Sequence, residues 1–134
     1  MPRLSGIDHL VLTVRDLNQT VRFYRDILGM GVERYEAADA TIRTALKFGS
    51  HKINLHLAGA EFDPKAKMAT PGSADLCFIT ETPLTDWQQK LTRLNVPVLE
   101  GPVPRTGAKG RMTSIYIRDP DGNLLEIAQY SETR

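Results

Sequence analysis

The stretch Asp8-His9-Leu10-Val11-Leu12-Thr13-Val14 places apolar side chains at alternate positions, which predicts a β-strand. Residues 17–28 follow with apolar side chains at helical spacing, and Met30-Gly31-Val32 leads out of that helix. A shift of 66 residues, from Asp8 to Ala74, repeats this plan, with a strand predicted over 74–80 and a helix over 84–94. A repeat constrains the fold more than any single local signal does.

The later strands of each half also correspond. A shift of 70 residues places 45–56 over 115–126, and both segments predict hairpins. The Asp119-Pro120-Asp121-Gly122 turn is typical of a tight connection between strands. Each half is therefore a strand, a helix and about three antiparallel strands. We expect an α+β fold of paired βαβββ repeats, about 6–60 and 73–130, forming a curved mixed sheet with a cleft inside.

Composition limits the partners. A chain of 134 residues with 41% hydrophobic residues predicts one domain over 1–134 with a real core. The net charge is +1 and the charges are interspersed, which argues against nucleic acid and charged membrane surfaces as partners. No apolar run approaches the roughly 20 residues of a membrane span, so we expect a cytoplasmic protein. Cys77 is the single cysteine, and its apolar neighbours predict a buried, inert thiol.

Four potential metal ligands fall at inward positions of the predicted strands. Alternation turns His9, His56, Asp75 and Glu126 toward the cleft, with His9 equivalent to Asp75 and His56 equivalent to Glu126 in the repeat. Each residue alone has an ordinary structural interpretation, but two symmetric pairs favour joint ligation. Two imidazoles and two carboxylates suit zinc, nickel, manganese, iron or cobalt. We expect His51, in a hairpin turn, to be solvated.

Residues 101–111 contain two prolines, three glycines and three basic residues, which predicts a loop. The spacing of a phosphate-binding P-loop is absent. Arg105, Lys109 and Arg111 are either solvated or pair with an anionic group of a substrate.

Tyr116 is expected to face the same cleft as Glu126, either as a filling aromatic or as a substrate contact. The long loop over 61–72 is a second candidate lid, and its composition does not decide the matter.

These motifs resemble the vicinal oxygen chelate superfamily, which includes glyoxalase I, fosfomycin-resistance transferases, extradiol dioxygenases and bleomycin-binding proteins. The resemblance is carried by Asp8 to Val14, by Phe23-Tyr24 with Leu28-Gly29-Met30, and by Asp119 to Glu126. Within the superfamily the chain is most similar to the glyoxalase-domain-containing protein 5 group and to bacterial glyoxalase-like virulence proteins. The segments that carry this closer similarity are Lys52 to His56, Pro71 to Leu76 and Gly101 to Gly110.

The resemblance implies metal ligands at His9, His56 and Glu126. The fourth position departs from the pattern, because active members usually have histidine where this chain has Asp75. Glyoxalases also typically have glutamate at the position of His56. Val11 stands where fosfomycin transferases tend to have threonine, which counts against that activity.

The resemblance further implies a metalloenzyme that chelates two adjacent oxygens of a small substrate. A lyase or isomerase similar to lactoylglutathione lyase is the first choice, with Glu126 as base, His56 in reserve and glutathione as a candidate cosubstrate. Extradiol dioxygenation and thiol transfer are alternatives. A non-catalytic, resistance-type binding protein is the alternative from another class. A homodimer is expected from the resemblance alone.

Overall fold

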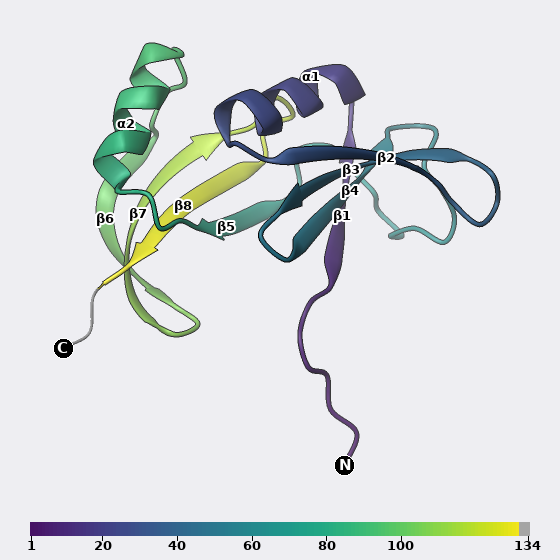
Figure 1. Ribbon diagram of the computed structural model, residues 1–134, viewed down its shortest axis with the longest axis horizontal. Coiled ribbons are helices and arrows are strands. Elements are labelled where there is room, and N and C mark those ends of the chain that lie inside the picture. Colours follow the sequence, from purple (N-terminus) through teal and green to yellow (C-terminus); the bar gives the residue numbers. More distant parts are fainter. Residues whose placement is uncertain (132–134) are drawn as a thin grey trace. The chain divides into compact units, whose positions relative to one another are not determined.

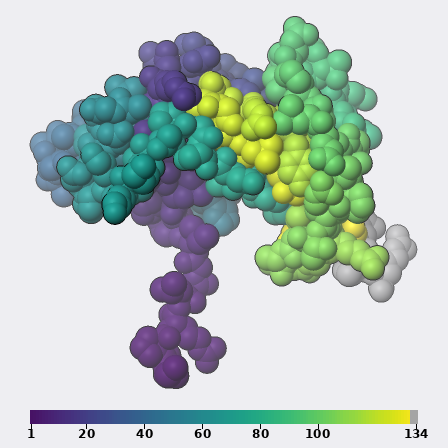
Figure 2. Space-filling model, turned by 180° about the vertical axis from the view of Figure 1, so that it is seen from behind, coloured from purple at the N-terminus to yellow at the C-terminus, as the bar shows by residue number. Residues whose placement is uncertain are grey.

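The computed structural model describes residues 1–131 (Figure 1). Contacts within the chain divide it into two compact units, 1–71 and 72–134, and each is described by itself. The division falls between the two predicted repeats. Residues 1–8 precede the first strand and are exposed, and Figure 2 shows them in purple. Within the described residues, no helix has the length and apolar character needed to cross a membrane.

The first unit is a βαβββ arrangement. Its elements are β1 (His9–Val14), α1 (Leu17–Arg22), the π-helical turn η1 (Phe23–Ile27), β2 (Gly31–Glu36), β3 (Ile42–Phe48) and β4 (His51–Leu57). The strand order is β1-β4-β3-β2, in which β1 runs parallel to β4 and the other neighbours are antiparallel. Asp16 caps α1, because its side chain accepts a hydrogen bond from the backbone N–H of Gln19 at 2.9 Å.

The second unit repeats the arrangement. Its elements are β5 (Asp75–Ile79), α2 (Leu84–Arg93), β6 (Glu100–Gly107), β7 (Gly110–Arg118) and β8 (Leu124–Tyr130). The order is β5-β8-β7-β6, and β5 runs parallel to β8. The predicted α+β class and the paired βαβββ repeats are confirmed.

Each helix packs on one face of its own sheet and leaves the other face free for polar groups. In the first unit α1 contacts β4, and Val21 and Ile53 are buried. In the second unit α2 contacts β8, and Leu91, Ile115 and Leu125 are fully buried. Burying one such side chain contributes about 1.5–3 kcal/mol. The apolar helix-facing side chains therefore fix which side of each sheet carries the candidate residues.

The loop predicted over 101–111 is wrong for most of its length. Residues 100–107 form β6 and residues 110–118 form β7. Pro102 and Pro104 misled the prediction, because proline cannot donate to a strand ladder. Since β6 is the edge strand of its sheet, one side of it needs no partner. Arg105 thus lies on a strand and not on a mobile lid.

Candidate functional site

Strand register identifies the equivalent positions in the two units. Val11 pairs with Asn54 across β1 and β4, and Cys77 pairs with Glu126 across β5 and β8. Val11 and Cys77 are themselves equivalent, since each lies two residues after the start of its strand. Asn54 is therefore the counterpart of Glu126.

The predicted equivalence of His56 and Glu126 is wrong. His56 pairs with Thr13 and Ala128 pairs with Ile79, so His56 corresponds to Ala128. The shift between β4 and β8 is 72 residues, from 54 to 126, and not the 70 of the ungapped overlay. Connections of different length cause the error, because Gly49-Ser50 joins β3 to β4 whereas residues 119–123 join β7 to β8.

His9 begins β1 and is exposed on the free face of the first sheet. Its Nδ1 lies 2.9 Å from Oδ1 of Asp8. This hydrogen bond is the largest cause that lowers the pKa of the Asp8 carboxyl. Because Nδ1 is engaged, Nε2 is the ring nitrogen that His9 offers to another partner.

His56 lies on the same free face but in different surroundings. It is 8% exposed, and the Phe62 ring packs against it edge-on, with 5.4 Å between ring centroids. The Arg43 guanidinium lies 3.9 Å from the centroid of the Phe62 ring. Burial, followed by the nearby charge of Arg43, lowers the pKa of His56.

The two imidazoles of the first unit do not lie together. His9 pairs with Lys52 and Thr13 pairs with His56, so four residues of strand separate them, roughly 13 Å at a rise of about 3.3 Å per residue. Asn54 lies between these positions, and Tyr35 Oη donates a hydrogen bond to its Oδ1 at 3.4 Å. Sequence reasoning missed the correspondence between Asn54 and Glu126, because only the strand register reveals it.

Glu126 lies near the middle of the free face of the second sheet. Its Oε2 accepts a hydrogen bond of 2.6 Å from Oγ of Ser114, which is completely buried. Asp75 lies on the same face, two residues before Cys77, the register partner of Glu126. The two predicted carboxylate ligands of this unit thus lie on neighbouring strands of one face.

Cys77 is exposed, so the predicted burial of its thiol is wrong. The apolar flanking residues Leu76 and Phe78 face the helix side, and they said little about the residue between them. The pKa of Cys77 is raised to about 11, first by desolvation and then by the charge of Glu126, to which the thiol is hydrogen-bonded. The thiol is therefore a proton donor to Glu126 at neutral pH and a poor nucleophile.

Tyr116 pairs directly with Glu126 across β7 and β8, so the two residues share a face as predicted. Arg105, on β6, donates from Nε to Tyr116 Oη at 2.8 Å and from Nη2 to Glu100 Oε1 at 3.3 Å. The hydrogen bond with Tyr116 is the main cause that raises the pKa of Arg105. Arg111 pairs with Thr106 and lies on the opposite face of the sheet from Arg105 and Tyr116.

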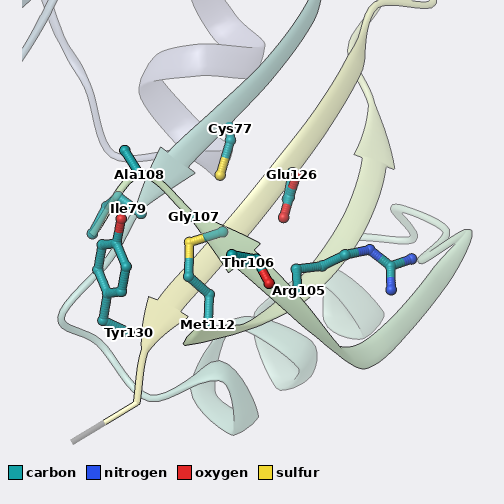
Figure 3. A pocket seen from close by; sticks show the side chains of 9 residues that line it. All are labelled: Cys77, Ile79, Arg105, Thr106, Gly107, Ala108, Met112, Glu126 and Tyr130. Atoms are coloured by element: carbon teal, nitrogen blue, oxygen red, sulfur yellow. The ribbon is translucent and has the colours of Figure 1, made fainter. Parts of the chain in front are cut away.

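A cavity of about 320 Å³ opens on the free face of the second sheet (Figure 3). Polar and apolar side chains line it at different ends. The lining residues are Cys77, Ile79, Arg105, Thr106, Gly107, Ala108, Met112, Glu126 and Tyr130. Figure 3 shows the guanidinium of Arg105 directed away from the other labelled side chains. Lys109 follows Ala108 in the turn, and its backbone N–H donates to Tyr130 Oη at 3.0 Å.

The four predicted metal ligands are divided equally between the units, with His9 and His56 in the first and Asp75 and Glu126 in the second. Among residues 1–131, no three histidine, cysteine, aspartate or glutamate side chains converge into a metal-binding group. The donor types still suit a divalent ion, since a free imidazole nitrogen and two carboxylates are ligands that zinc, manganese and iron accept. His56, packed beneath Phe62, is the least accessible of the four.

Residues 6–127 match the family model of the Glyoxalase/Bleomycin resistance protein/Dioxygenase superfamily. The chain belongs to this superfamily. Its relatives in the superfamily include virulence protein STM3117 of Salmonella typhimurium, 55% identical over 127 residues, which cover 95% of this chain and 85% of the relative. The crystal structure of that protein matches with a TM-score of 0.91 at 52% identity, covering 97% of this chain and 100% of the other.

Two further members of the superfamily are similar over most of their length. The glyoxalase domain-containing protein RDO1 of Mycosarcoma maydis is 48% identical over 131 residues, which cover 98% of this chain and 72% of the relative. The crystal structure of lactoylglutathione lyase from Agrobacterium tumefaciens matches with a TM-score of 0.68 at 25% identity and covers 95% of each chain. The family resemblance drawn from the sequence is confirmed.

Proposed function

We propose that the chain is a divalent-metal-dependent enzyme of the glyoxalase type, acting on a small substrate with two adjacent oxygens. The observation that carries this proposal is the environment of Glu126. Its carboxylate lies on the wall of a cavity, is oriented by the buried Ser114 hydroxyl at 2.6 Å and neighbours a protonated thiol. A carboxylate that is held in place at a cavity wall suits proton transfer to and from a bound substrate.

His9, Asp75 and Glu126 are proposed as donors to the metal, with His56 as the remaining candidate. The free Nε2 of His9 and the two carboxylates supply the donor types that the ion needs. Bound to these residues, a divalent ion polarises the substrate oxygens and stabilises negative charge as it develops.

Glu126 is proposed as the base. The Ser114 hydroxyl occupies Oε2, which leaves Oε1 to take a proton from a carbon next to a carbonyl and to return it to the adjacent carbon. Cys77 remains protonated at neutral pH and keeps its proton directed at Glu126. The apolar wall formed by Ile79 and Met112 limits the access of water to the proton being moved.

Tyr116 and Arg105 are proposed to bind the polar end of the substrate. Tyr116 lies opposite Glu126, and Arg105 is held against Tyr116. Arg105 keeps its charge at all working pH values, so it can hold an anionic group. Lys109 and Arg111 are weaker candidates, because Lys109 lies in the turn and Arg111 faces the other side of the sheet.

The test is turnover of the hemithioacetal of methylglyoxal and glutathione. The purified chain is reconstituted separately with zinc, nickel, manganese, iron and cobalt, and formation of the thioester product is followed by absorbance. We expect turnover with at least one metal, lost in Glu126→Gln and retained in Asn54→Ala, a change at the equivalent position of the other unit. Absence of turnover with all five metals would reject the glyoxalase reaction, and dioxygenation of a catechol and thiol transfer would then be tested in the same way.

A second candidate is a binding protein that sequesters a small molecule without reaction. The largely apolar end of the cavity, with Ile79, Ala108, Met112 and Tyr130, favours it. Thermal shift in the presence of a chelator separates the two functions. Stabilisation by apolar or cationic ligands despite the chelator supports sequestration, whereas stabilisation by metal alone supports the enzyme.

We also propose that the chain forms a homodimer, which follows from the resemblance. Light scattering coupled to size exclusion tests this, and a mass of a single chain at micromolar concentration would contradict it.

A further inference from the structure

The turn between β6 and β7 forms one end of the cavity. Thr106, Gly107 and Ala108 line the cavity, and the last strand pair, Gly107 with Gly110, leaves only Ala108 and Lys109 in the turn. Tyr130 Oη accepts a hydrogen bond of 3.0 Å from the Lys109 backbone N–H. Tyr130 thus ties the tip of the turn to the end of β8.

Gly107 gives a second, independent sign that Tyr130 and the turn are fitted together. A Cβ atom at this position would lie 2.6 Å from Met112 Sδ and 2.8 Å from Tyr130 Oη. Both distances are shorter than van der Waals contact, so the two side chains occupy the space that only glycine leaves open. Any larger residue at 107 must displace the hydroxyl that holds Lys109.

The two ends of the cavity differ in chemistry. Glu126 and Cys77 form a polar end, whereas Met112 and Tyr130 belong to an apolar end. Glu126 and Tyr130 lie four residues apart on β8, which is roughly 13 Å of strand. A ligand that places its oxygens at Glu126 directs any apolar substituent toward the turn.

We infer that Tyr130 is a positioning residue that holds the β6–β7 turn as the end wall of the cavity, and that Tyr130 and Gly107 together limit the length of the substituent on the substrate. The limit on length rests on the proposed function. The hold of Tyr130 on the turn does not, because it is a contact within the free protein. The ligand class is a small molecule with two adjacent oxygens and a short apolar tail.

Hydrogen exchange of the Lys109 amide, measured by NMR on the full chain, tests the hold directly. Tyr130→Phe removes the acceptor, and we expect the Lys109 amide to exchange about fivefold faster or more. Gly107→Ala keeps the hydroxyl but displaces it, so the same acceleration is expected by a different route. Tyr35→Phe, which removes a tyrosine hydroxyl from the first unit, is the matched control and leaves Lys109 unchanged.

Unchanged exchange at Lys109 in both Tyr130→Phe and Gly107→Ala overturns the inference. If one variant fails to fold, the other decides alone. Acceleration at Lys109 without any turnover of the hemithioacetal leaves the hold of Tyr130 standing and rejects only the proposed reaction.

The limit on substituent length is tested with two 2-oxo acids, pyruvate and 2-oxooctanoate, titrated into the metal-reconstituted protein. The wild type is expected to bind pyruvate more tightly, and Tyr130→Phe is expected to reduce the ratio of the two affinities at least threefold. An unchanged ratio, or no binding of either acid, overturns the claim on length.

Discussion

The two units share a backbone plan, but they carry different chemistry on the free face of the sheet. At one pair of equivalent positions the first unit has Asn54, bonded to Tyr35, and the second has Glu126, bonded to Ser114. At the next pair, His56 in the first unit corresponds to Ala128 in the second. The same scaffold therefore presents imidazole and amide groups in one unit and carboxylates beside a cavity in the other. The difference teaches that register positions, and not the fold, decide what each face can bind.

The largest expected effect separates Glu126 from its counterpart. Glu126→Gln keeps the shape of the side chain but removes the base, so we expect kcat/KM for the hemithioacetal to fall about 10²- to 10⁴-fold. Asn54→Asp, a change of similar size at the equivalent position, is expected to stay within about threefold, because Asn54 takes no part in proton transfer. Equal losses in the two variants would show that the two faces do not differ in the way described.

The next effect concerns Cys77, whose environment has no parallel at Val11 in the first unit. With a pKa of about 11 in place of the ordinary 9.0, the thiol should react with iodoacetamide about 100-fold more slowly at pH 8. Glu126→Gln removes a negative charge that raises this pKa, and we expect the alkylation rate to increase. Mass spectrometry follows the reaction cleanly, since the chain has one cysteine. Alkylation as fast as that of a free thiol would contradict this description of Cys77.

A smaller effect is expected from Ser114. Ser114→Ala removes the donor to Glu126 and should lower the free energy of unfolding by about 1–2 kcal/mol, measured by urea denaturation. Thr113→Ala, on the opposite face of the same strand, is the matched control and should cost less. If the control costs as much, the hydrogen bond to Glu126 contributes no special stability.

The smallest effect is a dependence of stability on pH through His56. Its pKa is lowered in the folded protein from the ordinary 6.5, so the unfolded chain takes up the proton first as the pH falls. Acidification from about pH 7.5 to 5.5 should therefore lower Tm, and His56→Gln should make that slope shallower. The contribution of His56 is the difference between the two slopes, and a steeper slope in the variant would contradict the lowered pKa.

The fold could be predicted from sequence because the first strand and helix of each half repeat at a constant shift. Alternation along the strands also placed Glu126 and Tyr116 on one face, as the register confirms. The pairing of His56 with Glu126 could not be checked in this way, because an overlay without gaps ignores the different lengths of the turns. A correction of two residues keeps the face but changes the partner, and so the error left no sign in the alternation.

Other features depend on tertiary structure. The prolines of β6 are compatible with a strand only because that strand lies at an edge, and the sequence does not tell which strand is at the edge. The contact of Tyr130 with Lys109 joins residues 21 positions apart and has no local signal. The assignment of metal ligands stays a prediction, since donor type is read from sequence but convergence is not.

The most direct test of the central claim is the metal content of the purified chain after anaerobic reconstitution with each candidate metal. Elemental analysis should find about one divalent ion per chain in the wild type. The double variant His9→Ala with Glu126→Ala should bind none, and Asn54→Ala should bind as much as the wild type. A wild type without bound metal under every condition, or a double variant that keeps its ion, would contradict the account.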